Sequence, residues 1–329
     1  MSGQIEQILK YALDAGASDI ILAENKKPCI RLNGNVGALA EAPEISKEDL
    51  DSFFSSFSLS SEKTIIGPLL GSRFRVFFTR SASGKVFILR PLLPAIPDFG
   101  SINAPESVQN LLSLVSGLLL FAGKPSSGKT IASMSFIEAY CKQNLKRLAI
   151  FDESEEYEFS LNETLLIRAS LKENPEEIVS PILASGIDVF YFGNLKKEHF
   201  ALALKAASSG ALVVGTVQAN SSVAVLSQFL NENVSRILLA STLSSIVVEH
   251  LLPSSDNTAL VPAWEVLYNN PNIAAQIRNG DLYKIPQLIH MGKQEGMLSL
   301  DDSLMQLVQA SYITKEEACR IASEPAKFV

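Results

Sequence analysis

The chain has 329 residues, more than one hydrophobic core usually contains, and this length favours two domains. Apolar residues make up 47% of the sequence and charged residues only 19%, which indicates well-filled cores and surfaces that are buried against other subunits. The net charge of -7, without any long run of Lys and Arg, argues against a nucleic-acid partner. Cys29, Cys141 and Cys319 are odd in number and far apart, so neither a disulfide framework nor a metal knuckle is expected.

The start of the sequence carries acidic residues and lacks the basic end and apolar stretch of a signal peptide. The most apolar segment, residues 111–122, is broken by Ser113, Ser116 and Gly117. It is also well short of the roughly 20 residues that a spanning helix needs. We therefore expect a cytoplasmic protein.

Residues 1–95 are predicted to form a small α+β domain. A helix is expected at 5–13, where apolar residues recur at helical spacing, and Gly16 stops it. A second helix is expected after Ser46 and Asp49, which resemble a capping box, with an apolar stripe through Phe57. Short apolar or alternating runs predict strands at 19–22, 29–32, 73–79 and 86–89.

Residues 96–329 are predicted to form an α/β domain with a doubly wound, mostly parallel sheet. Four prolines between residues 91 and 105 mark the linker that precedes it. Helices are expected at 130–140, from Asn174 onward, and throughout the chain after Trp264. The predicted strands lie at 118–121, 147–151, 189–192 and 211–217.

A phosphate-binding loop (P-loop) is predicted between the first of these strands and the helix that follows. Its residues fit the pattern G-x-x-x-x-G-K-[ST] at every fixed position: Gly123, Lys124, Pro125, Ser126, Ser127, Gly128, Lys129 and Thr130. Lys129 would reach the β and γ phosphates of ATP, and Thr130 would ligate Mg²⁺. The alternatives are a glycine turn that binds nothing and a Rossmann loop, but the G-x-G-x-x-G spacing of the latter is missing. ATP and Mg²⁺ are therefore the expected cofactors.

From this loop outward the sequence resembles the secretion ATPases of type IV pili and type II secretion, most closely the retraction ATPases of the PilT type. The segments that carry the likeness are 17–20, 30–34, 73–76, 117–120, 206–216 and 296–301. The resemblance implies a RecA-like P-loop NTPase domain behind a smaller N-terminal domain. It also implies a homohexamer with nucleotide between subunits, which moves pilin at the inner membrane.

The resemblance also implies that Arg73, Arg75 or Arg90 reaches the nucleotide across a subunit boundary. The alternative is that these arginines lie on the solvent face of a hairpin.

At four places the sequence departs from the family pattern. Asn194 stands where the family has the Walker B glutamate, and an amide can orient a water molecule but cannot accept its proton. Gln218 replaces the histidine of the motif G-T-x-H, which senses the γ-phosphate. Ile21 replaces a histidine of the N-terminal domain, and segment 272–278 keeps one of two arginines. The three remaining histidines, at 199, 250 and 290, are interpreted as structural or surface residues.

Asp152, Glu153 and Glu156 align with the acidic box of the family at the end of the second strand of the sheet. Asp152 would help to hold Mg²⁺ or its waters, whereas the alternative is an ordinary solvated loop.

We therefore predict a homologue that binds ATP-Mg²⁺ with weak or absent hydrolysis. It would act as a regulatory or structural subunit of a type IV pilus or type II secretion machine. Its partners would be further copies or an intact paralogue in a hexamer, and platform proteins at the inner membrane. The alternative is an active hexameric ATPase that drives pilus retraction or twitching motility, with Glu153 or Glu156 activating the water.

Overall fold

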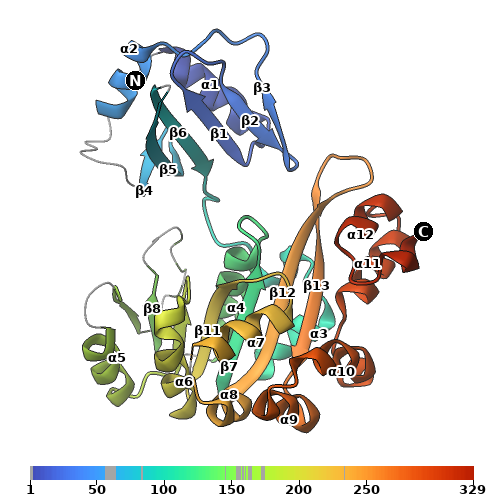
Figure 1. Ribbon diagram of the computed structural model, residues 1–329. Helices are drawn as coiled ribbons and strands as arrows, with labels where there is room; N and C mark the ends of the chain where they lie inside the picture. The colour runs from blue at the N-terminus through green and yellow to red at the C-terminus, as the bar shows by residue number, and fades with distance from the viewer. Residues whose placement is uncertain are drawn as a thin grey trace. The chain divides into compact units, whose positions relative to one another are not determined.

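In the computed structural model the chain divides into two compact units, each built of helices and one β-sheet (Figure 1). The first unit comprises Met1–Ala95, Ser154–Glu158 and Asn257–Ala259, and the second comprises Ile96–Glu153, Phe159–Asp256 and Leu260–Val329. The residues described are 3–55, 64–82, 84–144, 146–152, 157, 159, 161, 165–171, 175–232 and 234–329.

The first unit is a six-stranded antiparallel sheet in the order β3-β2-β1-β6-β5-β4. Its strands are β1 (Asp19–Ala23), β2 (Cys29–Leu32), β3 (Asn35–Ala38), β4 (Thr64–Leu69), β5 (Ser72–Ser81) and β6 (Gly84–Pro91). Helices α1 (Gly3–Asp14) and α2 (Lys47–Ser55) pack on one face of it. The predicted helices and strands are confirmed, whereas β3 and β4 were not predicted and Phe57 lies outside the described residues.

Apolar and arginine side chains alternate along β5, and this alternation gives the sheet one buried apolar face and one face that carries arginines. Phe74, Val76 and Phe78 are buried against the helices. Because successive side chains of a strand point to opposite faces, Arg73 and Arg75 lie on the face away from α1 and α2. The capping box is also present, since the Asp49 N–H donates to Ser46 Oγ at 3.1 Å and Ser46 Oγ donates to Asp49 Oδ2 at 2.7 Å.

The second unit is built on a seven-stranded sheet in the order β13-β12-β7-β11-β10-β8-β9. All neighbouring strands run parallel except β13, which is antiparallel to β12. The strands are β7 (Gly117–Gly123), β8 (Leu148–Phe151), β9 (Leu166–Arg168), β10 (Val189–Phe192), β11 (Leu212–Gln218), β12 (Leu243–Pro253) and β13 (Leu260–Tyr268). Every residue of β7 is buried, as expected for a parallel strand that is covered on both faces.

Helices cover both faces of this sheet, which confirms the doubly wound architecture. On one face α4 (Lys129–Asn144) places Phe136 against Phe121 of β7, with the ring centroids 5.8 Å apart. The opposite face, with Leu120 of β7, packs against α5 (Pro175–Ala184), α6 (Phe200–Ser208), α7 (Ser222–Asn231), α8 (Arg236–Thr242), α9 (Pro271–Asn279) and α10 (Ile285–Met291). The short helix α3 (Glu106–Gln109) precedes β7.

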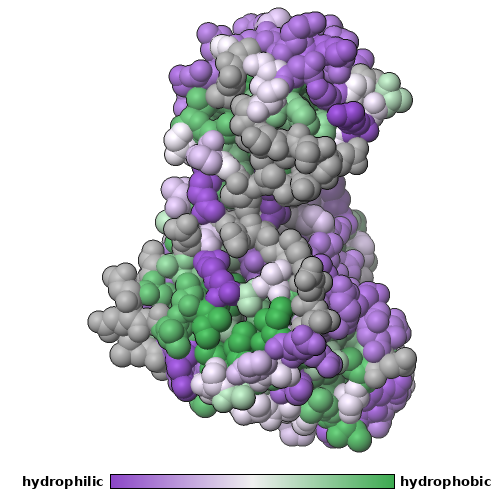
Figure 2. Space-filling view, turned by 90° about the vertical axis from the view of Figure 1, so that its left-hand side faces the viewer, coloured by the Kyte–Doolittle hydropathy of each residue, from purple (hydrophilic) through white to green (hydrophobic). Residues whose placement is uncertain are grey.

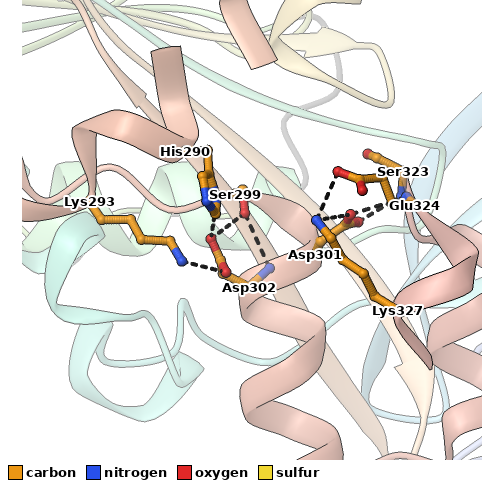
Figure 3. Close-up of polar contacts among 8 residues, drawn as sticks. All are labelled: His290, Lys293, Ser299, Asp301, Asp302, Ser323, Glu324 and Lys327. Carbon is orange, nitrogen blue, oxygen red and sulfur yellow. Dashed lines mark hydrogen bonds and ion pairs between the residues drawn. The ribbon is translucent and has the colours of Figure 1, made fainter. Parts of the chain in front are cut away.

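The C-terminal helices α11 (Leu300–Gln309) and α12 (Lys315–Ile321) form a small apolar cluster with the ends of β12 and β13. Asp301 fixes the chain end, because its carboxylate accepts hydrogen bonds from the N–H groups of Ser323 and Glu324 at 2.7 and 3.1 Å (Figure 3). Lys327 lies 3.6 Å from the same carboxylate. Over the described ranges, no helix is both long and apolar enough to cross a membrane.

Candidate functional site

The predicted P-loop runs from Gly123, the last residue of β7, to Thr130 in the first turn of α4. Ser126 and Gly128 have φ values of +65° and +95°, and such left-handed residues let a loop turn its N–H groups inward. A side chain at Gly123 would overlap Ser127 Oγ and the carbonyl oxygen of Glu249. The fixed glycines of the motif are therefore required by close packing as well as by backbone conformation.

The polar groups of this loop suit a bound phosphate. Lys129 is 9% exposed, and its Nζ donates to the Lys124 carbonyl at 3.1 Å, a contact within the loop that phosphate oxygens can replace. Ser127 Oγ is buried without a hydrogen-bond partner in the described part of the chain. The first N–H groups of the 16-residue helix α4 have no partner within the helix and carry its partial positive charge.

Thr130 and Asp152, the two residues expected to bind Mg²⁺ or its waters, lie beyond the ends of two different strands. Thr130 is in the first turn of α4, and Asp152 follows β8 directly. The Asp152 carboxylate lies against the Cα of Gly193, because a Cβ atom there would overlap it. Both offer the oxygen ligands that Mg²⁺ prefers. Glu153 and Glu156 lie outside the described residues, so their proposed role stays a prediction.

Asn194 and Gln218, the two residues expected to replace catalytic groups of the family, lie at the carboxyl ends of neighbouring strands. Asn194 is exposed just beyond β10, and Gln218 is the exposed last residue of β11, in register with Gly123. The strand ends are tied together: the Thr216 hydroxyl donates to the Gly193 carbonyl, and the Leu195 N–H donates to the Thr216 carbonyl at 2.9 Å. The surroundings of the site are thus ordered, but these two side chains offer amides where a carboxylate and an imidazole were expected from the resemblance.

Sequence reasoning missed a buried acid beside the P-loop. Strand β12 runs parallel to β7 with Val248 opposite Ala122, so Glu249 comes level with Gly123. Its carboxyl group occupies the space beside the Cα of Gly128, and the residue as a whole is 6% exposed. Burial raises the pKa of Glu249 to about 8, although the charge of Lys129 acts in the opposite direction. The available signal was a charged residue inside the apolar run of residues 246–252.

His250, the next residue of β12, also lies near the loop. Its ring hydrogen-bonds the backbone of Asn220 and lies near Lys124, while its Nε2 is buried without a partner among the described residues. Burial lowers the pKa of His250, so the ring is neutral at physiological pH. The other two histidines fit the structural interpretation: His199 is buried, and His290 is 3.5 Å from Asp302 (Figure 3).

The three predicted nucleotide arginines gather on one face of the first unit. Arg75 and Arg90 are paired across β5 and β6. Arg90 donates to Asp19 Oδ1 through Nε at 2.9 Å and Nη2 at 2.7 Å, and Asp19 is only 4% exposed. The charges of Arg75, Arg90 and Arg73 all act on the phenol of Tyr157, whose pKa is raised by burial. A role for these arginines toward nucleotide stays a prediction.

Comparisons with known proteins identify the family and several relatives of this chain. Residues 98–309 match the model of a family described as Type II/IV secretion system protein. The twitching motility protein of Neisseria gonorrhoeae is 24% identical over 92% of this chain and 86% of its own length. The type IV pilus ATPase PilU of Pseudomonas aeruginosa is 24% identical over 96% of this chain and 87% of its own.

Solved structures show the same fold. The pilus retraction motor PilT with bound ADP is 25% identical, with a TM-score of 0.78 over 98% of both chains. The ATPase DotB of Legionella pneumophila superposes with a TM-score of 0.81 over 96% of this chain and 94% of its own, at 16% identity.

Proposed function

Because this chain belongs to the family of type II/IV secretion system proteins, we propose that it binds ATP-Mg²⁺ but hydrolyses it weakly or not at all. It then serves as a regulatory or structural subunit of a type IV pilus or type II secretion machine. The observation that carries this proposal is a complete P-loop beside strand ends that present Asn194 and Gln218.

Binding and turnover depend on different parts of the sheet. The loop between β7 and α4 supplies N–H groups, Lys129 and Thr130 to the phosphates and Mg²⁺, and none of these contacts requires Asn194 or Gln218. Mg²⁺ would neutralise phosphate charge next to Thr130 and Asp152. Asn194 can orient a water molecule but cannot accept its proton, and loss of a general base typically lowers a rate by about 10²–10⁴.

Association with other subunits completes the proposal. The low charged fraction of 19% supports subunit contacts. Apolar surface is visible in the second unit from the side of α5 and β8 (Figure 2). Near there, Leu165 is 57% exposed, and Ile167 and Ile182 are half-buried. A cytoplasmic hexamer, homomeric or mixed with a paralogue, that docks on platform proteins at the inner membrane is consistent with these surfaces.

Two measurements on the purified chain test the proposal. ATP-Mg²⁺ at 100 times its Kd should stabilise the wild type by about 2.7 kcal/mol, visible in thermal melting, and the Lys129→Ala control should lose this shift. Phosphate release by the wild type should stay at the level of Lys129→Ala. Asn194→Glu should raise it, Gln218→His should raise it less, and the double change should exceed both.

Each part of the proposal can fail separately. Absence of any ATP-dependent shift in the wild type contradicts nucleotide binding. Strong phosphate release by the wild type, unaffected by Asn194→Glu, contradicts weak hydrolysis. The second candidate would then apply: an active motor for retraction or twitching, with Glu153 or Glu156 activating the water. The names of the twitching motility protein and of PilT favour this alternative.

A further inference from the structure

The feature that the proposed function leaves unused is the buried Glu249 carboxyl group. It sits beneath the first turn of α4, where a side chain on Gly128 would overlap it. Its Oε2 atom is buried without a hydrogen-bond partner within the described residues. A buried acid without full hydrogen bonding is costly as a carboxylate, so the packing favours the neutral acid.

The charged surroundings of Glu249 are sparse. Lys129, at the start of α4, is the one charged side chain of the described residues found to act on its ionisation. Gly123 of β7 lies beside the backbone carbonyl of Glu249, and Trp264 of β13 is the residue paired with Glu249 across the strands. His250 is the next residue of β12, so its ring lies on the opposite face of the sheet from the Glu249 side chain, near Asn220 and Lys124.

Ionisation of Glu249 would therefore act on Lys129 and on the phosphate site together. A carboxylate at this place attracts the Lys129 ammonium, the group that has to reach the β and γ phosphates. It also opposes the negative charges of a polyphosphate, and because Glu249 and Lys129 are themselves buried, this repulsion is weakly screened. The neutral acid does neither.

We propose that Glu249 is a positioning residue of the nucleotide site. Its neutral form leaves the Lys129 ammonium available to bind a polyphosphate, and its ionised form opposes that binding. Nucleotide binding is then coupled to retention of a proton on Glu249. The inference rests on the proposed function, because it requires that the P-loop binds a nucleoside polyphosphate.

The sign of the coupling follows from linkage. Bound phosphates disfavour the carboxylate, so they push the pKa of Glu249 above its value of about 8 in the free protein. Near pH 7 the free protein already carries the proton, and binding costs nothing extra. At pH 9 the free carboxyl group is ionised in roughly nine of ten molecules, so the Kd should be roughly tenfold higher than at pH 7.

The test is a calorimetric titration of the full-length protein with ADP-Mg²⁺ and with ATP-Mg²⁺ from pH 7 to 9. The wild type should lose roughly tenfold in affinity over this range. Glu249→Gln, which keeps the shape but cannot ionise, should bind at pH 9 nearly as tightly as at pH 7. The matched control is Glu265→Gln. Glu265 is also a buried acid of the sheet, but it accepts a hydrogen bond from the Ser222 N–H on α7 at 2.6 Å, so its replacement should leave the wild-type profile unchanged.

The outcomes separate this inference from the proposed function. Parallel pH profiles for wild type and Glu249→Gln would overturn the role of Glu249 while leaving nucleotide binding intact. A profile flattened equally by Glu265→Gln would also overturn it, because the effect would then be unspecific. No binding by either protein at any pH would refute the proposed function itself, and the inference with it.

Discussion

Because the pKa of Glu249 is higher in the folded than in the unfolded chain, the free energy of unfolding should fall toward alkaline pH even without nucleotide. The pKa of Glu249 rises from 4.5 to about 8 because burial disfavours the carboxylate. Below pH 4.5 the carboxyl group is protonated in both the folded and the unfolded chain. Between pH 4.5 and 8 only the unfolded chain releases the proton, so the free energy of unfolding falls as the pH rises.

The magnitude follows from the pKa values. At about 1.4 kcal/mol per pKa unit, the rise from 4.5 to about 8 corresponds to about 5 kcal/mol at pH 8 and above, as an upper bound. Glu249→Gln removes the ionisation and keeps the volume. Relative to wild type, the variant should therefore gain stability steadily between pH 5 and pH 8.

Trp264 provides the assay. It is the single tryptophan of the chain, is 3% exposed and pairs with Glu249 across β12 and β13. Its fluorescence during urea unfolding therefore reports the second unit. Glu198→Gln, a change at an exposed acid of the same unit, is the control and should show no such trend. A stability difference between wild type and Glu249→Gln that stays constant from pH 5 to pH 8 would refute the assignment of a neutral carboxyl group.

Two further outcomes are expected elsewhere in the second unit. Asp301→Ala removes the acceptor of two backbone hydrogen bonds. At about 1.5–3 kcal/mol for each bond to a charged group, it should cost about 3–6 kcal/mol in urea unfolding. Asp302→Ala breaks more exposed ion pairs and should cost less than about 1 kcal/mol. Equal losses would contradict the special role of Asp301 at the chain end. Cys141 is fully buried, and burial raises its pKa to about 12. Iodoacetamide at pH 8 should therefore leave this thiol unmodified in the native protein, as measured by mass spectrometry. Labelling of the native protein as fast as that of the protein in urea would contradict this burial.

Local signals allowed much of the fold to be predicted. The P-loop is contiguous in sequence, so residues 123–130 indicated strand, loop and helix without knowledge of the tertiary structure. The family resemblance and the fold class drawn from such segments are confirmed. The strand at 189–192 has the predicted bounds, because a short, wholly apolar run between polar residues is typical of a buried parallel strand.

Long-range pairing limited the rest of the prediction. Strands β9, β12 and β13 were not predicted. The helical C-terminal region begins after Tyr268 rather than after Trp264, because β13 continues to Tyr268. Even with both strands known, their order in the sheet does not follow from their own residues. Glu249 is more than a hundred residues from Gly128 in sequence, and only the insertion of β12 beside β7 brings the two together. Sequence alone could mark this acid as unusual but could not locate it.

The strand order also explains why phosphate binding and water activation can change independently. β7 lies between β12 and β11, so the P-loop has Glu249 on one side and Gln218 on the other, with Asn194 one strand further. Substitutions at the ends of β10 and β11 alter the groups that would handle water without touching the packing beneath Gly128. A change at Glu249 acts on that packing and on Lys129 without reaching Asn194. Affinity and turnover should therefore respond to separate substitutions, and Glu249→Gln combined with Asn194→Glu should show the sum of the two single effects rather than a new one.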